Sequence, residues 1–345
     1  MAPGDGEKSR CKITVLSRMN NFCTLFDSYY LSRGIAMHDS LAKQAKSFHL
    51  YIFPFDDIAY RILAELNLEH VTLVKMSDFE DEELLRIKPT RTKGEYCWTC
   101  TPSIILYCIK KYNLQDCTYL DADLYFFSDP AVLVDELGED SILITEHRYS
   151  KEYADAITSG IYCVQFISFK NNRRGLIALN WWRERCIEWC YDRLEDGKFG
   201  DQKYLNDWTA RFEGVHILQN LGGGVAPWNV QQYKIEKDDS TYWISDQKQR
   251  VELGFYHFHW VKFQKNNMAD VGAYDLAFPY IQDIYADWLK TVMKIDQMLF
   301  EKFNFSVIKP KDPILKALRS FIRTLRRKVE GKYKVIDLKT FSIRG

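Results

Sequence analysis

The sequence predicts an α/β protein with a mixed, mainly parallel sheet, flanked by helices and extended by further helices at the C-terminus. The first observation is an alternation of strand-like and helix-like segments in the N-terminal part. It places strands at 13–17, 48–53 and 71–74 and helices at 24–46 and 58–66. Such alternation is typical of parallel strands that right-handed helical crossovers connect.

The second observation is a set of polar residues that follow predicted strands. Asn20 comes after the first strand, Asp56 after the second, and Asp121 and Asp123 after a short apolar strand at 118–120. In parallel sheets ligands bind where the carboxyl ends of the strands meet, so we expect these side chains at one binding edge. The sequence has no Gly-x-Gly-x-x-Gly or Walker-type loop, which argues against a dinucleotide or P-loop site.

Composition narrows the class of protein further. A length of 345 residues with 46% hydrophobic residues allows one large domain or two smaller ones with a sizeable core. Lys+Arg and Asp+Glu are equal at 47 each, so no net charge favours nucleic acid as a partner. The nine cysteines form no paired framework, and we interpret Cys97 and Cys100 as small buried hydrophobic residues. Reduced thiols and a polar start without a signal peptide predict a cytoplasmic protein.

The motif Asp121-Ala122-Asp123 interrupts an otherwise apolar stretch. A carboxylate in apolar surroundings needs a partner or a metal, or it loses its charge. Two acids at a strand end offer oxygen ligands to a hard divalent cation and leave positions open for phosphate oxygens and water. The alternative is a pair of solvated turn residues after an edge strand.

This motif, with its apolar flanks and the Asp-Pro that follows, resembles the Asp-x-Asp signature of GT-A-fold glycosyltransferases. It is most similar to that of glycosyltransferase family 8, the galactosyltransferase and glycogenin group. The resemblance implies a Rossmann-like GT-A sheet. It also implies that Asp121 and Asp123, with Ala122 between them, hold Mn²⁺ (or Mg²⁺) against the diphosphate of a nucleotide-sugar. It extends over roughly 13–262 through motifs in the same order as in the family.

A second motif, Asp-Gln-x-x-Leu-Asn at 201–206, is also similar to family 8. The resemblance implies that Asp201 binds the donor sugar and that Gln202 lies beneath the reacting carbon. The alternative is a helix start with Asp201 as the N-cap. Gly160, before a strand-like run, resembles the family segment in which glycine precedes a buried strand beneath the donor sugar.

Two histidines, His257 and His259, alternate with aromatic residues in a third motif. On a strand both would face the same side. The family pattern is His-Phe-x-Gly followed by Lys, but here Trp260 stands where Gly would be, and the lysine is Lys262 or Lys265. Either histidine can be the third metal ligand, and we favour His257. Lys262 or Lys93 would stabilise charge on the leaving group.

The C-terminal part differs in character from the rest. Within 313–329 apolar residues recur at helical spacing opposite lysines and arginines, which predicts either an anchor for anionic lipid or a docked terminal helix. We divide the chain into a disordered leader (1–10), a catalytic domain (11–265), C-terminal helices packed on the core (266–308) and a basic amphipathic tail (309–345).

These observations predict a metal-dependent glycosyltransferase. It would move a sugar from a nucleotide-diphospho-sugar, UDP-linked and with retention if family 8 is the right comparison, to a glycan or lipid-linked acceptor. A tail that contacts the membrane would place it at the inner face of the membrane. The alternatives are an inverting GT-A enzyme, a sugar-phosphate nucleotidyltransferase, and a non-catalytic nucleotide-sugar-binding protein at the membrane.

Overall fold

The computed structural model describes residues 18–264, 267–276, 280–307, 322 and 324–344. The predicted leader at 1–10, the predicted strand at 13–17 and most of the predicted amphipathic helix at 313–329 lie outside these residues. Among the described residues, no helix combines the length and the apolar character that crossing a membrane requires.

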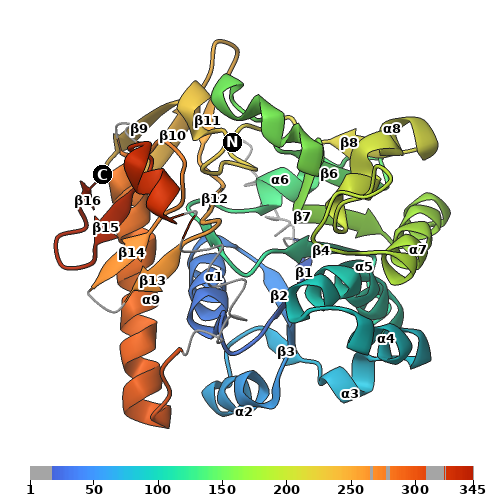
Figure 1. Ribbon diagram of the computed structural model, residues 1–345. Coiled ribbons are helices and arrows are strands. Elements are labelled where there is room, and N and C mark those ends of the chain that lie inside the picture. The colour runs from blue at the N-terminus through green and yellow to red at the C-terminus, as the bar shows by residue number, and fades with distance from the viewer. Residues whose placement is uncertain (1–17, 265–266, 277–279, 308–321, 323, 345) are drawn as a thin grey trace, which may run out of the picture.

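A seven-stranded sheet in the order β3-β2-β1-β4-β7-β6-β8 forms the centre of the molecule (Figure 1). Its strands are β1 (Asn20–Phe26), β2 (Phe48–Pro54), β3 (Val71–Leu73), β4 (Asp116–Leu120), β6 (Ile142–Glu146), β7 (Tyr162–Lys170) and β8 (Val215–Ile217). Strand β7 runs antiparallel to both of its neighbours, and the other pairings are parallel. The carboxyl ends of six strands therefore meet the start of β7 at one edge of the sheet.

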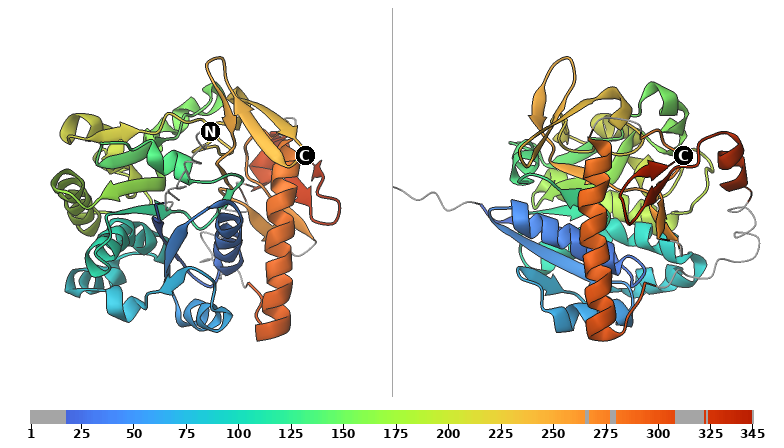
Figure 2. Two further views of the ribbon diagram at one scale, coloured as in Figure 1. Left: turned by 180° about the vertical axis from the view of Figure 1, so that it is seen from behind. Right: turned by 90° about the vertical axis from the view of Figure 1, so that its left-hand side faces the viewer.

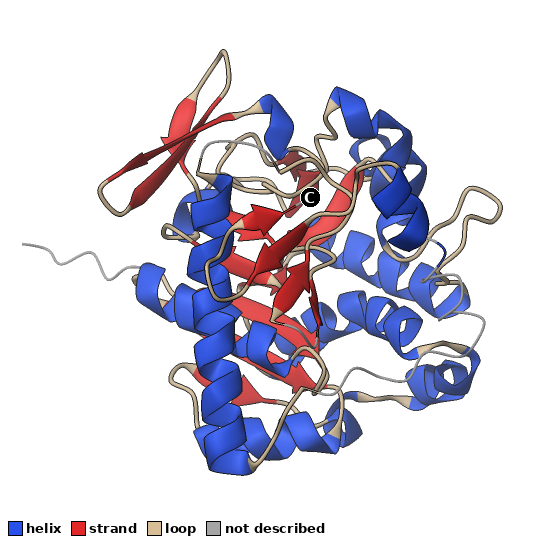
Figure 3. Cartoon of the chain, turned by 60° about the vertical axis from the view of Figure 1, so that its left-hand side comes forward, coloured by secondary structure: helices blue, strands red, loops and turns tan. Residues whose placement is uncertain are grey.

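Helices cover both faces of this sheet, which lies between them (Figure 3). Neighbouring residues of β1 show the two faces, because Phe22 packs into one core cluster and Cys23 into the other. The first cluster includes α1 (Leu31–Gln44), α2 (Asp57–Leu66) and α9 (Ile281–Phe303). The second includes α3 (Met76–Phe79), α4 (Glu82–Ile87), α5 (Lys93–Lys111), α7 (Arg173–Glu188) and α8 (Trp208–Arg211). The predicted α/β class with a mainly parallel sheet is confirmed.

The N-terminal elements differ from those that the sequence predicts. Residues 20–26 form β1, and α1 begins only at Leu31, so the predicted loop at Asn20 and helix at 24–46 are wrong at their N-terminal ends. The run Phe22–Phe26 is buried on both faces of the sheet, so it lacks the alternation by which a strand is told from a helix. The strand ends at Phe26, and Asp27 follows it.

Proline suits the first position of a helix, but α5 begins at Lys93, well before its proline. Pro102 lies inside the helix and does not open it. The helix starts with a capping box, in which the Thr92 hydroxyl accepts from the Glu95 amide and the Glu95 carboxylate accepts from the Thr92 amide. Cys97 and Cys100 lie in this helix as free thiols, partly and fully buried, which agrees with our interpretation of them as packing residues.

Smaller sheets extend the molecule beside the central one. They are the pair β5 (Leu124–Phe126) and β12 (Phe255–His257), the three strands β9 (Lys234–Asp238), β10 (Thr241–Ser245) and β11 (Arg250–Glu252), and the four strands β13 (Lys262–Gln264), β14 (Met268–Asp270), β15 (Val335–Asp337) and β16 (Ile343–Arg344). The long helix α9 runs along one side of the molecule against α1 (Figure 2). The last sheet joins residues from three of our predicted segments, and the domain limits themselves stay a prediction.

The connections carry short helical elements that reach the carboxyl edge of the sheet. Helix α6 (Ala131–Asp135) follows β5. The part of the chain that the structure describes also has four 3₁₀ segments: η1 (Lys88–Thr90), η2 (Lys151–Ser159), η3 (Gln202–Asp207) and η4 (Val230–Gln232). Residues 324–329 are helical as well. Segments η2 and η3 carry or border the predicted sugar-binding residues, so their contacts matter for the site.

Candidate metal centre

Asp121, Asp123 and His257 meet just beyond the carboxyl end of β4. The Nε2 atom of His257 is 3.1 Å from Oδ1 of Asp123 and 3.8 Å from Oδ2 of Asp121. One ligand atom from each residue lies within 4.8 Å of the other two. Two carboxylates and an imidazole at this separation can surround one divalent cation.

Backbone pairing explains why residues so distant in sequence converge here. Strand β12 pairs with β5 directly after the motif, with His257 opposite Leu124. The amide of Asp121 donates to the carbonyl of Gln165 on β7 (3.0 Å), and the carbonyl of Asp123 accepts from the amide of Phe258 (3.0 Å). The two acids are therefore fixed by the main chain of both neighbouring strands.

Gln165 fixes the orientation of the imidazole. Its side-chain oxygen lies 2.6 Å from Nδ1 of His257, and the glutamine is fully buried. An Nδ1–H that donates to this oxygen leaves Nε2 directed at the two acids, which is the arrangement that histidine ligands of metals adopt. The sequence did not point to Gln165, because a single glutamine in a buried strand carries no recognisable pattern.

The electrostatics of the three residues depend on burial and on each other. Burial favours a raised pKa for Asp123, but the charges of His257, His259 and Arg33 outweigh it and lower the pKa to about 2. For Asp121, burial is the larger influence and raises the pKa to about 6. Burial opposes the charge of His257, yet Asp123 and Asp121 raise its pKa well above the usual range. The centre therefore favours a positive charge between two acids.

Arg33 on α1 supplies a fixed positive charge near this centre, and the sequence did not reveal it. Its guanidinium is buried and donates to the carbonyls of Tyr29 (3.3 Å) and Val261 (3.0 Å). It also lies 4.5 Å from the ring centroid of Tyr30. Arg33 thereby connects α1 to the segment that follows His257.

The second histidine takes a different position from the first. Strand β12 ends at His257, so His259 does not continue the strand as we expected, and its ring centroid lies 5.6 Å from that of His257. Burial, then the neighbouring His257, lowers the pKa of His259 to about 4. The geometry thus favours His257 as the third ligand, with His259 beside the centre.

Trp260 occupies the place where the family pattern has glycine. Its φ of +69° lies in the left-handed region that glycine adopts without strain. The indole ring lies 4.2 Å from Nζ of Lys262, at the start of β13. The chain therefore keeps a glycine-like turn here with a side chain that contacts the predicted phosphate-binding lysine.

Lys93 joins two acids that follow β1 and β2. Its Nζ lies 2.7 Å from Oδ2 of Asp27 and 3.2 Å from Oδ2 of Asp56. Asp56 also accepts from the amide of Ala59, as the N-cap of α2, and from the amide and hydroxyl of Ser28. Lys93 is thus engaged by carboxylates, and Asp27 is a polar residue of this edge that our misplaced strand concealed.

Asn20 lies far from these residues along its strand. It is the first residue of β1, paired with Phe48 at the start of β2, and it is buried. The carboxyl end of β1 is at Phe26. The structure therefore places Asn20 at the opposite edge of the sheet from Asp121 and Asp123.

Asp201 and Gln202 lie on the same side as the metal centre. Burial, and then the charge of Asp121, raise the pKa of Asp201 to about 8. The side-chain amide of Gln202 donates to the carbonyl of Ser159 (2.9 Å). Gly160 follows with a φ of +131°, which only glycine tolerates well. The structure thus brings η3, Gly160 and the Asp-x-Asp motif together at one edge.

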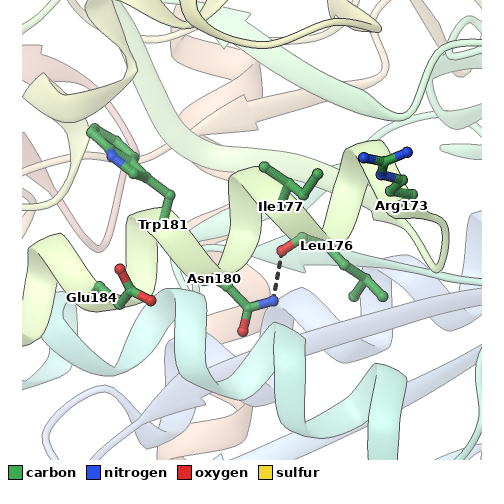
Figure 4. Close-up of a pocket in the computed structure, with 6 residues that line it drawn as sticks. All are labelled: Arg173, Leu176, Ile177, Asn180, Trp181 and Glu184. Carbon is green, nitrogen blue, oxygen red and sulfur yellow. Dashed lines mark hydrogen bonds between the residues drawn. The ribbon is translucent and has the colours of Figure 1, made fainter.

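Two other features could be taken for sites. A surface hollow follows α7 and is lined by Arg173, Leu176, Ile177, Asn180, Trp181 and Glu184 (Figure 4). All six residues come from one helix, so the hollow is an open helix surface. Cys23, Cys108 and Cys117 also have neighbouring sulfur atoms, but they are fully buried in an apolar cluster, where we interpret them as packing residues.

The protein is thus an α/β protein in which two aspartates and a histidine converge at the carboxyl edge of the central sheet. No protein-family model matches the chain. It is 33% identical over 242 residues to the uncharacterized protein YfnD of Bacillus subtilis (strain 168), a match that covers 69% of this chain and 76% of YfnD. It is 30% identical over 296 residues to the uncharacterized protein YfnF of the same organism, over 82% of this chain and 96% of YfnF. The chain belongs to the family of these two proteins.

Solved structures that resemble this one include three glycosyltransferases. The match to mouse xyloside xylosyltransferase 1 has a TM-score of 0.45 at 11% identity and covers 70% of this chain and 98% of the mouse chain. The match to the galactosyltransferase LgtC, in complex with donor and acceptor sugar analogues, has a TM-score of 0.39 at 12% identity. It covers 57% of this chain and 72% of the LgtC chain. The match to the glycosyltransferase GlyE of Streptococcus pneumoniae TIGR4 has a TM-score of 0.36 at 15% identity. It covers 58% of this chain and 45% of the GlyE chain.

Proposed function

We propose that this protein is a metal-dependent glycosyltransferase that uses a nucleotide-diphospho-sugar as donor. The observation that carries the proposal is the convergence of Asp121, Asp123 and His257 within 4.8 Å at the ligand-binding edge of the sheet. These residues can hold Mn²⁺ or Mg²⁺ on one side, which leaves the other side for phosphate oxygens. The sequence resemblance to family 8 supports the same three residues.

The chain's own residues would bind the donor in two parts. A bound divalent cation would supply charge stabilisation for the leaving diphosphate, and Lys262 would add to it. Asp27 and Asp56 follow the carboxyl ends of β1 and β2, and Lys93 at the start of α5 bridges them. Together they would hydrogen-bond the nucleoside. UDP is the nucleotide that the resemblance favours. Because Asn20 lies at the opposite edge, it is not part of this site.

The donor sugar would lie beneath η3. Asp201 is buried beside Asp121 and would accept hydrogen bonds from sugar hydroxyls once it is charged. Gln202, held by the carbonyl of Ser159, would present its side-chain oxygen to the reacting carbon. Gly160 would let the main chain approach the sugar closely. Retention of configuration follows from the family resemblance and is part of the proposal.

The acceptor would be a glycan or a lipid-linked sugar, which a protein at the membrane surface can reach. In the described end of the predicted amphipathic segment, Ile322, Leu325 and Val329 are exposed. Arg327 is buried instead, in a bidentate ion pair with Asp270. The exposed apolar residues support a contact with the membrane, while the ion pair attaches this segment to β14.

Nucleotide release from a panel of UDP-, GDP- and dTDP-hexoses, with Mn²⁺ and with EDTA, tests the proposal. We expect slow, metal-dependent release of one nucleoside diphosphate, absent in Asp123→Ala. The exposed Asp135 on α6 gives a matched control, because Asp135→Ala removes a carboxylate away from the centre. Binding of a donor without release would favour the non-catalytic alternative, and neither binding nor release would contradict the transferase.

A further inference from the structure

A small aromatic cluster borders the metal centre. The buried ring of Trp228 lies 5.3 Å from the ring of His257 and 5.4 Å from that of His259, between centroids. On its other sides Trp228 contacts Tyr149 (6.4 Å) and Tyr274 (6.5 Å). These two tyrosines are thus one ring removed from a proposed metal ligand.

Three half-buried tyrosines form the outer part of this cluster, and we call Tyr149, Tyr153 and Tyr274 the tyrosine platform. All three pack against a small hydrophobic cluster of Cys163, Ala226 and Trp228, and Tyr274 also packs against the first large core. The rings of Tyr153 and Tyr274 meet edge to face at 5.0 Å. Partly exposed aromatic rings beside a catalytic centre are available to a ligand, whereas the rings of the large cores are covered by helices.

The hydroxyl groups of the platform are also available. Among the described residues, those of Tyr149 and Tyr274 have no hydrogen-bond partner, while that of Tyr153 accepts from the amide of Asp275 (2.7 Å). A surface that combines aromatic faces with unpaired phenolic hydroxyls offers apolar contact and directed hydrogen bonds together. Sugar rings present the matching combination of C–H faces and equatorial hydroxyls.

The three tyrosines carry no formal charge, and the carboxylates of Asp275 and Glu152 act on Tyr153. His147 stacks on Tyr149 with centroids 4.7 Å apart and planes 9° apart, and it contacts Trp228 at 5.3 Å. Its burial lowers its pKa to about 3, so it is neutral at physiological pH. A surface of neutral rings beside two carboxylates disfavours a phosphate or an acidic sugar and so favours an uncharged ligand.

Segment η2 connects the platform to the proposed sugar-positioning residue. At one end Tyr153 contacts Tyr274, and at the other the carbonyl of Ser159 accepts from Gln202. None of the nine residues of η2 is buried. The platform and the residue proposed to lie at the reacting carbon are therefore joined by one exposed segment.

We propose that Tyr149, Tyr153 and Tyr274 form the acceptor subsite and that this subsite takes an uncharged saccharide ring. The inference rests on the proposed function and specifies its acceptor. In it the rings of Tyr153 and Tyr274 stack on the saccharide, and the hydroxyls of Tyr149 and Tyr274 hydrogen-bond to it. The bond from the anomeric carbon to the nucleoside diphosphate breaks as an acceptor hydroxyl oxygen bonds to that carbon, and the hydroxyl proton leaves with the diphosphate.

Transfer to methyl glycosides of neutral hexoses, with the nucleotide-sugar that the wild type hydrolyses, tests the subsite. Removing only hydroxyls, in Tyr149→Phe and Tyr274→Phe, should raise the KM for the saccharide about 2- to 12-fold. Removing a ring, in Tyr274→Leu, should raise the KM for the saccharide about tenfold or more. The KM for the donor should change less. Tyr107→Leu, on the other face of the sheet, is the matched control.

The outcomes separate the subsite from the transferase itself. In one outcome the wild type releases nucleotide, while Tyr274→Leu and Tyr107→Leu change the saccharide KM equally. That result contradicts the subsite alone. No nucleotide release from the wild type contradicts the proposed function.

Saturation-transfer NMR of the methyl glycosides, which needs no turnover, gives a second readout. A weaker saturation-transfer signal with Tyr274→Leu than with the wild type supports the subsite, and an unchanged signal overturns it. If Tyr274→Leu does not fold, the two phenylalanine variants decide.

Discussion

Two pairs of acids lie at the same edge of the sheet, and they are stabilised in different ways. Asp27 and Asp56 share the ammonium group of Lys93, and Asp56 caps α2 in addition. Asp121 and Asp123 face a histidine, whose positive charge depends on its protonation. The counter-ion of the first pair, Lys93, is permanently charged. The counter-ion of the second pair, His257, is charged only while it is protonated. Only the second can exchange its proton for a metal ion without losing a structural ion pair.

Exposure reinforces this difference. The side chain of Lys93 is 52% exposed, while that of His257 is 5% exposed. Ion pairs in contact with water contribute little to stability, whereas buried charges interact strongly. Acidity alone therefore does not identify a metal centre. Among the described residues no lysine or arginine forms an ion pair with Asp121 or Asp123, and their partner His257 is buried. These two features distinguish them from the pair held by Lys93.

Asp201 differs from both pairs, because it is buried and no cation is among the groups that shift its pKa. Its folded pKa of about 8 lies above the ordinary value of 3.8. Between about pH 4 and pH 8 the folded protein keeps a proton on Asp201 that the unfolded chain has lost. The free energy of unfolding therefore falls as pH rises through this range. In EDTA at pH 8, Asp201→Asn should raise the free energy of unfolding by up to about 5 kcal/mol.

Urea unfolding at pH 5 and pH 8 checks this sign. The gain from Asp201→Asn should be larger at pH 8 than at pH 5. Asp207→Asn, at an exposed position of the same segment, is the control. An equal effect of Asp201→Asn at both pH values would show that this carboxyl group is charged throughout the range.

Removing a ligand from the metal centre should have the next largest effect. Asp121→Asn should lower metal-dependent nucleotide release more than about 100-fold, since even outer-shell changes at metal sites cost 10- to 100-fold. Asp27→Asn, in the pair held by Lys93, should leave the Mn²⁺ dependence of the reaction as it is. Release measured over a Mn²⁺ series compares the two variants. Retained Mn²⁺ dependence in Asp121→Asn would refute its role as a ligand.

The two pairs also differ in how their partner is oriented. The imidazole of His257 is held by the side chain of Gln165, whereas the ammonium group of Lys93 contacts its two acids directly. Gln165→Leu removes the acceptor for Nδ1 of His257 and should raise the Mn²⁺ concentration for half-maximal release about 10- to 100-fold. The maximal rate at saturating Mn²⁺ should fall less. Circular dichroism confirms that the variant is folded. An unchanged half-maximal concentration in a folded variant would show that Gln165 does not orient the imidazole.

The smallest effect is expected at the N-cap of α2. Asp56→Ala removes the bond to the amide of Ala59 and one partner of Lys93, and should cost about 0.5–2 kcal/mol of stability. Its Mn²⁺ dependence should equal that of the wild type. Chemical unfolding and metal titration measure the two properties separately. A loss of Mn²⁺ binding would mean that the two acidic pairs are coupled.

The sequence predicted the parts of this edge that local patterns encode. Asp121 and Asp123 stand where an apolar strand ends, and Gly160 stands before one, so their places along the chain suffice to locate them. Strand β1 was misplaced because both of its faces are buried, which removes the alternation of polar and apolar residues. The error carried Asn20 into our predicted site and left Asp27 out of it.

Other residues of the site depend on contacts that no local pattern encodes. Gln165 reads as one polar residue of a core strand, and its role appears only when β12 brings His257 beside it. Arg33 reads as a helix surface residue, yet it is buried under the carbonyl of Val261, more than 200 positions away. The tyrosine platform likewise joins Tyr149 and Tyr153 to Tyr274, which lies in a distant part of the chain. Such residues become visible only in the folded chain.

Mn²⁺ titration followed by the EPR signal of the free ion tests the assignment of the metal centre most directly. We predict that the wild type binds Mn²⁺ at one site without nucleotide. Asp123→Asn should weaken this binding more than about 100-fold, and Asp56→Asn should bind as the wild type does. Equal affinity of the wild type and Asp123→Asn for Mn²⁺ would contradict the assignment of the metal centre.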